Sequence, residues 1–248
     1  AHSMPRILHC KDRTGFYIND ALERAVCAEP RITLLSPWLA VDLLTLDHHS
    51  RQKLDIYRPN MCLGAYVLDI TSNRIETILA RQTVLATGGV GGIYLHSTNS
   101  DAARGDGLAM AYRARVRLLN LEYIQFHPTT FYHPHSPRFL ISESMRGEGA
   151  RLIREDGNEF MHHYHESGSL APRDVVARAI HEELIEGNNP CVYLDISHKN
   201  ADWIRQRFPT ITGACLTLGV DITQDPIPVV PAAHYCCGGV ATDLYGRT

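Results

Sequence analysis

The stretch that most constrains this chain is a predicted helix over residues 170–187 with an arginine in its first turn. Pro172 suits the start of a helix, where a backbone N–H has no partner to lose. Ser167 and Ser169 offer hydroxyl groups as caps just before it. Apolar side chains then recur at helical spacing as far as Leu184, which predicts one buried face. They are Val175, Val176, Ala179 and Ile180.

Arg173 would lie at the very start of this helix. The helix dipole is already positive there, so an arginine is locally unfavourable. Together with the exposed N–H groups of the first turn, however, it can form a site for an anion. The alternative is a surface arginine paired with Asp174 or Glu166, and solvated pairs of that kind contribute little stability.

Composition restricts the class of protein. The chain has 248 residues, of which 44% are hydrophobic and 21% charged, and its formal net charge is -3. This is the composition of a globular protein with enough chain for two domains. No basic block is present, so nucleic acid is not expected as a partner. No apolar run reaches the roughly 18 residues of a membrane-spanning helix, so no membrane partner is expected.

Seven scattered cysteines without paired spacing predict neither a disulfide framework nor a zinc site. Reduced thiols in the cytoplasm fit best. Adjacent Cys236 and Cys237 resemble a metal or redox pair, but neighbours in a strand point to opposite faces, which favours packing roles. The tract with His162, His163 and His165 lacks the spacing of a known metal site, so no metal is predicted.

Two glycine-containing segments predict contact with a nucleotide. A β-branched run over 83–87 predicts a strand that ends in Gly88-Gly89, where no Cβ keeps a ligand from the backbone. Asn99 follows, and then Gly105-Asp106-Gly107 predicts a turn before a helix over 108–114. Dinucleotides bind at such strand-to-helix junctions in open α/β sheets. The G-x-G-x-x-G fingerprint itself is absent from the chain.

Two polar segments supply candidate pocket residues. An extended run over 120–130 reaches His127 just before Pro128, and the proline predicts that no central strand or helix continues there. The run over 140–150 places hydroxyls, two glutamates and an arginine around two glycines, and could present several polar groups to one pocket. The alternatives are a core histidine and a solvated loop.

The remaining elements follow from periodicity and turn residues. We expect helices, strands and connecting segments as follows: a helix over 12–28, strands over 31–36 and 38–44, a loop over 47–60, a hairpin of 62–69 and 74–80, a second hairpin around 155–158, a strand over 192–196, a helix over 201–208, and an extended proline-rich segment over 226–231.

Four motifs then occur in one order along the chain: Q-F-H-P-T at 125–129, R-G-E-G at 146–149, L-A-P-R-D-V-V-A-R-A-I at 170–180, and P-A-A-H-Y-x-C-G-G at 231–239. Together they resemble the flavoprotein family of succinate dehydrogenase, fumarate reductase and L-aspartate oxidase, and within it most the L-aspartate oxidase branch. The resemblance covers essentially all 248 residues. The glycine fingerprint and the C-terminal FAD segment of the family have no counterpart in the chain, so we expect a central piece of a longer protein.

The resemblance implies a mixed α/β and α+β fold with FAD as cofactor. Residues 1–121 would form part of a Rossmann-like FAD-binding domain, residues 122–232 the α+β capping domain that holds the substrate, and residues 233–248 a return to the FAD-binding domain. Arg115 departs from the family, which often has glycine there.

The resemblance also implies roles for single residues. Arg173 would be the catalytic proton donor or acceptor. The expected substrate-binding residues are His127, Thr129, Ser142, Glu143 and His234, and the expected FAD contacts are Ala86, Thr87, Gly88, Gly89, Asn99, Gly105 and Asp106. An arginine is a poor base at its usual pKa of about 12.5 or more, so the helix N-terminus and neighbouring cations would have to lower that pKa.

The implied activity is the flavin-dependent oxidation of a small dicarboxylate, with L-aspartate as substrate and oxygen or fumarate as acceptor, at the first step of quinolinate and NAD synthesis. Quinolinate synthase is the implied protein partner. The alternatives are a fumarate reductase or succinate dehydrogenase flavoprotein, acting on fumarate or succinate, and an inactive piece that keeps the fold.

Overall fold

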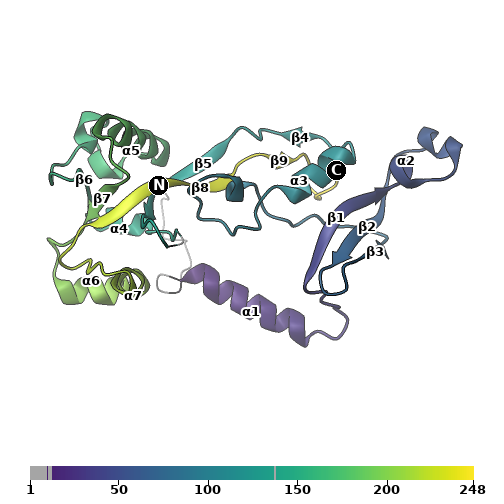
Figure 1. Cartoon of the computed structure of the whole chain (residues 1–248), viewed down its shortest axis with the longest axis horizontal. Helices are drawn as coiled ribbons and strands as arrows, with labels where there is room; N and C mark the ends of the chain where they lie inside the picture. The colour runs from purple at the N-terminus through teal and green to yellow at the C-terminus, as the bar shows by residue number, and fades with distance from the viewer. Residues whose placement is uncertain (1–9, 11–12, 137) are drawn as a thin grey trace. The chain divides into compact units, whose positions relative to one another are not determined.

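The computed structural model describes residue 10, residues 13–136 and residues 138–248, and their elements are drawn in Figure 1. The chain forms two compact units. The first unit comprises residues 1–32, 94–98 and 126–234, and the second unit comprises residues 33–93, 99–125 and 235–248. Each unit is assembled from separate stretches of sequence, so contacts distant along the chain define both.

A four-stranded sheet organises the first unit. Its strand order is β5-β8-β7-β6, with β5 at Ile124–Phe131, β8 at Ile227–Cys236, β7 at Val192–Asp195 and β6 at Arg151–Ile153. Strand β7 runs antiparallel to both β6 and β8. The strand expected over 192–196 is thus confirmed as the middle of a sheet.

Pro128 does not end its strand, contrary to the sequence prediction. Strand β5 continues through Pro128 to Phe131. It can do so because β5 is an edge strand, and an edge strand needs backbone N–H donors on one side only. His127 therefore lies inside a strand, with its backbone held by the sheet, rather than at the end of an extended run.

The proline-rich segment over 226–231 is likewise a strand. Strand β8 lies between β5 and β7, although it contains Pro228 and Pro231. Proline lacks only the donor, and the carbonyl of Pro228 still accepts a hydrogen bond from the N–H of Tyr132 at 2.8 Å. The ladder with β7 is correspondingly short and joins Ile227–Val229 to 192–194.

Helices pack on this sheet and enclose the main core. They are α4 at Glu143–Gly147, α5 at Arg173–Gly187, α6 at Ala201–Arg207 and α7 at Pro209–Thr217, with single 3-10 turns at Met161–His163 and Gly168–Leu170. The apolar stripe predicted for α5 is confirmed, because Val176, Ala179 and Ile180 are buried in the core. Helix α1 at Thr14–Ala28 has no buried residue.

The second unit is built on a three-stranded antiparallel sheet of β1 at Trp38–Thr45, β2 at Cys62–Asp69 and β3 at Arg74–Leu79. The predicted hairpin is therefore confirmed. Helix α3 at Asp106–Arg113 contributes Met110 to a small core with Leu43. Shorter elements are α2 at Leu46–His49, 3-10 turns at Lys53–Tyr57 and Gly91–Ile93, and the paired strands β4 at Leu118–Leu119 and β9 at Gly239–Val240.

Two predicted strands do not form. Residues 31–36 and 83–87 have no strand assignment, and the predicted loop over 47–60 contains a short helix and a 3-10 turn. An extended, apolar run becomes a strand only when a neighbour pairs with its backbone. Within the part of the chain that the structure describes, neither run has such a neighbour.

Arg115 closes α3 in a conformation that favours glycine. Its φ is +61°, and the N–H groups of Arg115 and Val116 donate to the carbonyls of Tyr112 and Ala111, both at 2.9 Å. This is the Schellman arrangement, whose left-handed position is usually a glycine because a Cβ is strained there. Arg115 also lies 3.6 Å from Asp47 in an ion pair whose arginine side chain is 76% exposed and whose aspartate side chain is 16% exposed.

We expect Arg115→Gly to be more stable than Arg115→Ala by about 0.5–1 kcal/mol, because glycine relieves the left-handed backbone that alanine keeps strained. Arg115→Ala is the matched control, since both variants lose the pair with Asp47 and only alanine keeps the Cβ. The melting temperature of the glycine variant should therefore exceed that of the alanine variant. A glycine variant that melts with the alanine variant would contradict the backbone explanation.

Within the described residues, every helix is too short or too polar to cross a bilayer.

Candidate functional site

Arg173 is the first residue of helix α5, as expected. Pro172 precedes it in an extended conformation, with φ −52° and ψ 147°, and forms the N-cap. The predicted serine caps are wrong, because no side chain caps this helix. Ser169 instead accepts a hydrogen bond from the N–H of Leu152 on its Oγ at 3.1 Å.

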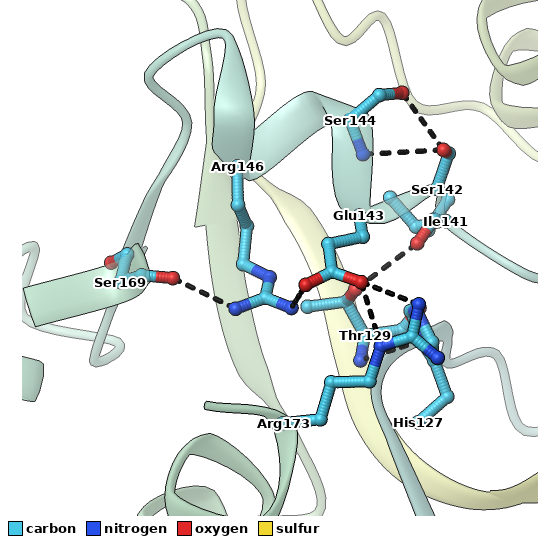
Figure 2. Close-up of polar contacts among 9 residues, drawn as sticks. All are labelled: His127, Thr129, Ile141, Ser142, Glu143, Ser144, Arg146, Ser169 and Arg173. Carbon is cyan, nitrogen blue, oxygen red and sulfur yellow. Dashed lines mark hydrogen bonds and ion pairs between the residues drawn. The ribbon is translucent and has the colours of Figure 1, made fainter. Parts of the chain in front are cut away.

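The partner of Arg173 is Glu143, from the first turn of α4 (Figure 2). Nε of Arg173 donates to Oε2 of Glu143 at 2.6 Å, and the terminal nitrogen NH2 lies 2.5 Å from the same oxygen. The side chains are 34% and 46% exposed. Asp174 pairs instead with Arg178, so the predicted surface pair of Arg173 with Asp174 does not form.

Arg146, which the sequence placed in the R-G-E-G motif without a role of its own, also belongs to this group of residues. Its side chain is 1% exposed, and its NH1 donates to the carbonyl of Ser169 at 2.8 Å. Its NH2 lies 3.5 Å from Oε1 of Glu143, and its Nε and NH2 have no hydrogen-bond partner among the described residues. Burial lowers the pKa of this guanidinium. The sequence signal for Arg146 was its place in the R-G-E-G motif, directly before Gly147.

Glu143 therefore lies between two arginines, as Figure 2 shows. One of its oxygens contacts Arg173 and the other approaches Arg146. Chemically, a carboxylate that shares a short hydrogen bond with a guanidinium can exchange a proton with it.

His127 is fully enclosed on β5 and is 1% exposed. Its Nδ1 lies 3.2 Å from both the backbone nitrogen and the carbonyl oxygen of Thr129. Burial, followed by the charge of Arg173 and the proximity of His234 and Arg146, lowers the pKa of His127 to about 3. The ring is thus neutral at pH 7 in spite of its polar surroundings.

The hydroxyls predicted to bind substrate serve the local structure. Thr129 donates its Oγ1 proton to the carbonyl of Ile141 at 3.1 Å, which ties β5 to the segment before α4. Ser142 caps α4, because its Oγ accepts from the N–H of Ser144 at 3.3 Å and lies 2.8 Å from the Ser144 hydroxyl. Both residues hold Glu143 in place (Figure 2).

His234 on β8 completes the group. Its ring centroid lies 5.3 Å from that of His127, and its Nδ1 is 2.7 Å from Oγ1 of Thr98. Burial and the charge of Arg173 lower its pKa. The first unit therefore brings together two guanidinium groups, two neutral imidazoles and one carboxylate, a donor-rich set suited to a small anion with several oxygens.

The predicted nucleotide contacts lie in the second unit. Gly107 allows helix α3 to lie close to the segment around Thr87, since a Cβ at Gly107 would lie 1.8 Å from Oγ1 of Thr87. Gly105 caps α3 with φ +86°, and Asp106 begins the helix with an exposed side chain. Ala86 directly precedes Thr87 and shares this placement. The structure thus brings residues near 87 and residues 105–107 together.

Gly88 and Gly89 continue the same close approach. Gly88 has φ +72°, which favours glycine, and a Cβ at Gly89 would lie 2.9 Å from the Cβ of Cys236. Asn99 begins the segment that leads to Gly105. This segment is held beside Gly92, because the N–H of Gly92 donates to the carbonyl of Ala103 at 2.8 Å. Bare backbone, a helix N-terminus and one carboxylate for sugar hydroxyls fit part of an FAD molecule.

Comparison with known proteins agrees with this chemistry. A family model described as an FAD binding domain matches residues 1–248. L-aspartate oxidase 1 of Ralstonia nicotianae is 53% identical over the whole chain, and the L-aspartate oxidase of Pseudomonas aeruginosa is 51% identical. In both, the chain spans only 45% of the relative's length.

Solved structures resemble the chain as well. A quinol-fumarate reductase with menaquinol superposes with a TM-score of 0.82 at 30% identity, covering 97% of this chain and 42% of that one. Mycobacterium smegmatis Sdh1 in complex with UQ1 gives a TM-score of 0.75 at 34% identity, covering 98% of this chain and 41% of that one.

The lowered pKa of His127 predicts a pH dependence of stability. Its pKa is about 3 in the folded chain and about 6.5 in an unfolded one, so the unfolded chain binds more protons between these values. The stability that depends on the neutral ring is therefore present above about pH 6.5 and is lost as the pH falls towards 3. Urea unfolding of His127→Gln, which cannot titrate, should depend less steeply on pH over this range, by a few kcal/mol in all.

His163→Gln is the matched control, because His163 is exposed on a 3-10 turn. It should retain the full pH dependence of the parent. Equal pH dependence in the His127 variant and the parent would show that His127 titrates normally.

Proposed function

Because the chain belongs to the family of FAD-binding domains that matches all of its residues, we propose that it provides the substrate pocket and part of the FAD-binding surface of an L-aspartate oxidase. The family's cofactor is FAD. The strongest support is the identity of 51–53% to L-aspartate oxidases over the whole chain. Since the chain spans less than half of those proteins, the activity proposed is that of the longer enzyme.

The proposed reaction converts L-aspartate and oxygen into iminoaspartate and hydrogen peroxide. With fumarate as the alternative acceptor, succinate would form in place of peroxide. When bound, FAD would supply the two-electron redox chemistry of this oxidation. In the second unit, the backbone at Ala86–Gly89 and around Gly105, together with Asn99 and the Asp106 carboxylate, would hold the cofactor.

The single observation that carries the pocket assignment is the Arg146–Glu143–Arg173 series beside two histidines. A dicarboxylate needs cations or hydrogen-bond donors at both ends. His127 and His234 would donate to substrate carboxylate oxygens, and Arg173 would supply positive charge. Glu143, already paired with Arg173, would not repel the anion as a free carboxylate would.

Arg173 would also move a proton at the substrate. Oxidation of an amino acid requires its ammonium group to lose a proton before the hydride leaves the carbon. The guanidinium of Arg173 can relay this proton because it shares a hydrogen bond of 2.6 Å with Glu143. Thr129 and Ser142 would act indirectly, by holding the backbone that carries Glu143.

A fumarate reductase or succinate dehydrogenase flavoprotein is the second candidate. It is supported by the TM-score of 0.82 to a quinol-fumarate reductase. An inactive piece that retains the fold is the third. Peroxide formed from aspartate by the FAD-loaded enzyme would separate the first candidate from the other two.

We place the enzyme in the cytoplasm at the first step of NAD synthesis, with quinolinate synthase as the partner that uses its unstable imine product. The domains proposed are residues 1–121 and 233–248 for FAD and residues 122–232 for the substrate.

Removal of Arg173 should abolish turnover without removing FAD. In the full-length enzyme, Arg173→Leu is expected to lower kcat by about 10²–10⁴-fold, the usual effect of losing a proton-transfer group. Flavin absorbance should remain stoichiometric. Arg178→Leu, on the same helix and in an exposed ion pair, is the matched control and should stay near the parent rate. A kcat of Arg173→Leu within threefold of the parent would exclude the residue from the mechanism.

The two histidines should contribute mainly to binding. His127→Ala and His234→Ala are each expected to raise the KM for aspartate and the inhibition constant of succinate by roughly 10- to 100-fold, because a hydrogen bond to a charged group is worth about 1.5–3 kcal/mol. Steady-state kinetics with succinate as inhibitor provides the measurement. If the inhibition constant of succinate stayed unchanged in both variants, the two histidines would have no role in substrate binding.

A further inference from the structure

Thr98 contacts the second histidine of the pocket from a segment that carries no motif. Its Oγ1 lies 2.7 Å from Nδ1 of His234, and both residues belong to the first unit. Backbone hydrogen bonds hold the segment beside β8: the N–H of Thr98 donates to the carbonyl of Ala233 at 3.0 Å, and the N–H of Ala233 donates to the carbonyl of His96 at 2.9 Å. These two backbone hydrogen bonds, one at Thr98 and one at His96, fix the position of the Thr98 hydroxyl beside His234.

The direction of the Thr98–His234 hydrogen bond decides what the ring can do. A neutral imidazole carries its proton on one nitrogen and accepts with the other. His234 is neutral near pH 7, because burial and Arg173 lower its pKa. With the proton on Nδ1, Nε2 could only accept and would repel a carboxylate. With the proton on Nε2, the ring can donate to that carboxylate.

The hydrogen bonds around Ala233 indicate the direction. A carbonyl oxygen has two lone pairs. That of Ala233 receives the N–H of Thr98 at 3.0 Å and the hydroxyl of Ser97 at 3.4 Å. Oγ1 of Thr98 is 3.3 Å from the same oxygen but only 2.7 Å from Nδ1 of His234. The single hydroxyl proton of Thr98 is thus best used at Nδ1, at the shorter distance and on an acceptor that needs it.

We propose that Thr98 is a positioning residue that donates its hydroxyl proton to Nδ1 of His234 and thereby keeps the proton of the neutral ring on Nε2, from which it donates to a substrate carboxylate. The inference rests on the proposed role of His234 in binding the dicarboxylate. Thr98 would touch neither substrate nor cofactor and would act only through the imidazole of His234.

His127 shows why the side chain of Thr98 matters at His234. Nδ1 of His127 lies 3.2 Å from both the N–H and the carbonyl of Thr129, so backbone alone can satisfy either tautomer of that ring. Nδ1 of His234 instead contacts a side-chain hydroxyl, that of Thr98. A substitution at Thr98 can therefore change the tautomer of His234 while the histidine itself stays in place.

The test compares dicarboxylate binding in four variants of the FAD-loaded, full-length enzyme, with succinate as a non-reacting probe in titration calorimetry. Thr98→Val keeps the shape and removes the hydroxyl, and should raise the Kd of succinate roughly 3- to 10-fold, the effect of one hydrogen bond. The KM for aspartate should rise in parallel, with kcat changed less than about twofold. Thr98→Ser restores the hydroxyl and should return the Kd to within about twofold of the parent.

Thr130→Val is the matched control. Its hydroxyl is buried on β5 and has no hydrogen-bond partner among the described residues, so its loss should leave the Kd unchanged. A Kd of Thr98→Val equal to that of the parent, or a Thr98→Ser variant as weak as Thr98→Val, would overturn the proposal.

His234→Ala separates this inference from the proposed function. Weakened succinate binding in His234→Ala together with normal binding in Thr98→Val would leave the substrate role of His234 in place and remove only the role of Thr98. Unchanged binding in His234→Ala would instead contradict the proposed function itself.

Discussion

The carboxylate of Glu143 is the group on which the pocket depends. It contacts Arg173 at the start of α5 and approaches Arg146, which is buried and, among the described residues, is otherwise held by the carbonyl of Ser169. A buried charge without a partner costs several kcal/mol, so the carboxylate allows two guanidinium groups to lie close together. The same contact gives the proton of Arg173 an acceptor. One side chain thus supports both the structure and the proposed chemistry of this site.

Burial, together with the positive charge around Glu143, also determines the state of the histidines. Burial is the larger cause that lowers the pKa of both His127 and His234, and the charge of Arg173 lowers it further. Neutral imidazoles avoid adding further charge to the pocket, but each can donate from one nitrogen only. Local partners must then select that nitrogen. This requirement connects backbone at Thr129 and the hydroxyl of Thr98 to substrate recognition, although neither belongs to the charged group.

The differences between prediction and structure have specific physical causes. The hairpin of β2 and β3 and the stripe of α5 were predictable because their patterns are local. Pro128 and the prolines of β8 suggested an interruption, yet the structure places them in strands, because β5 is an edge and proline carbonyls still accept. Residues 83–87 had the composition of a strand but no partner among the described residues. A strand forms only where another segment pairs with its backbone, and the spacing of apolar residues in the sequence does not show whether such a segment exists.

The sequence by itself determined the family, the helix that begins at Arg173 and the identity of most residues that gather around it, because motif order and apolar spacing are written along the chain. Only the tertiary structure decided which of these residues contact one another and which are buried. It paired Arg173 with Glu143 rather than with Asp174, enclosed Arg146, and placed Thr98 against His234 from 136 residues away. These contacts join segments that the sheet of the first unit brings together, and burial and hydrogen-bond direction depend on that packing rather than on any local pattern of residues.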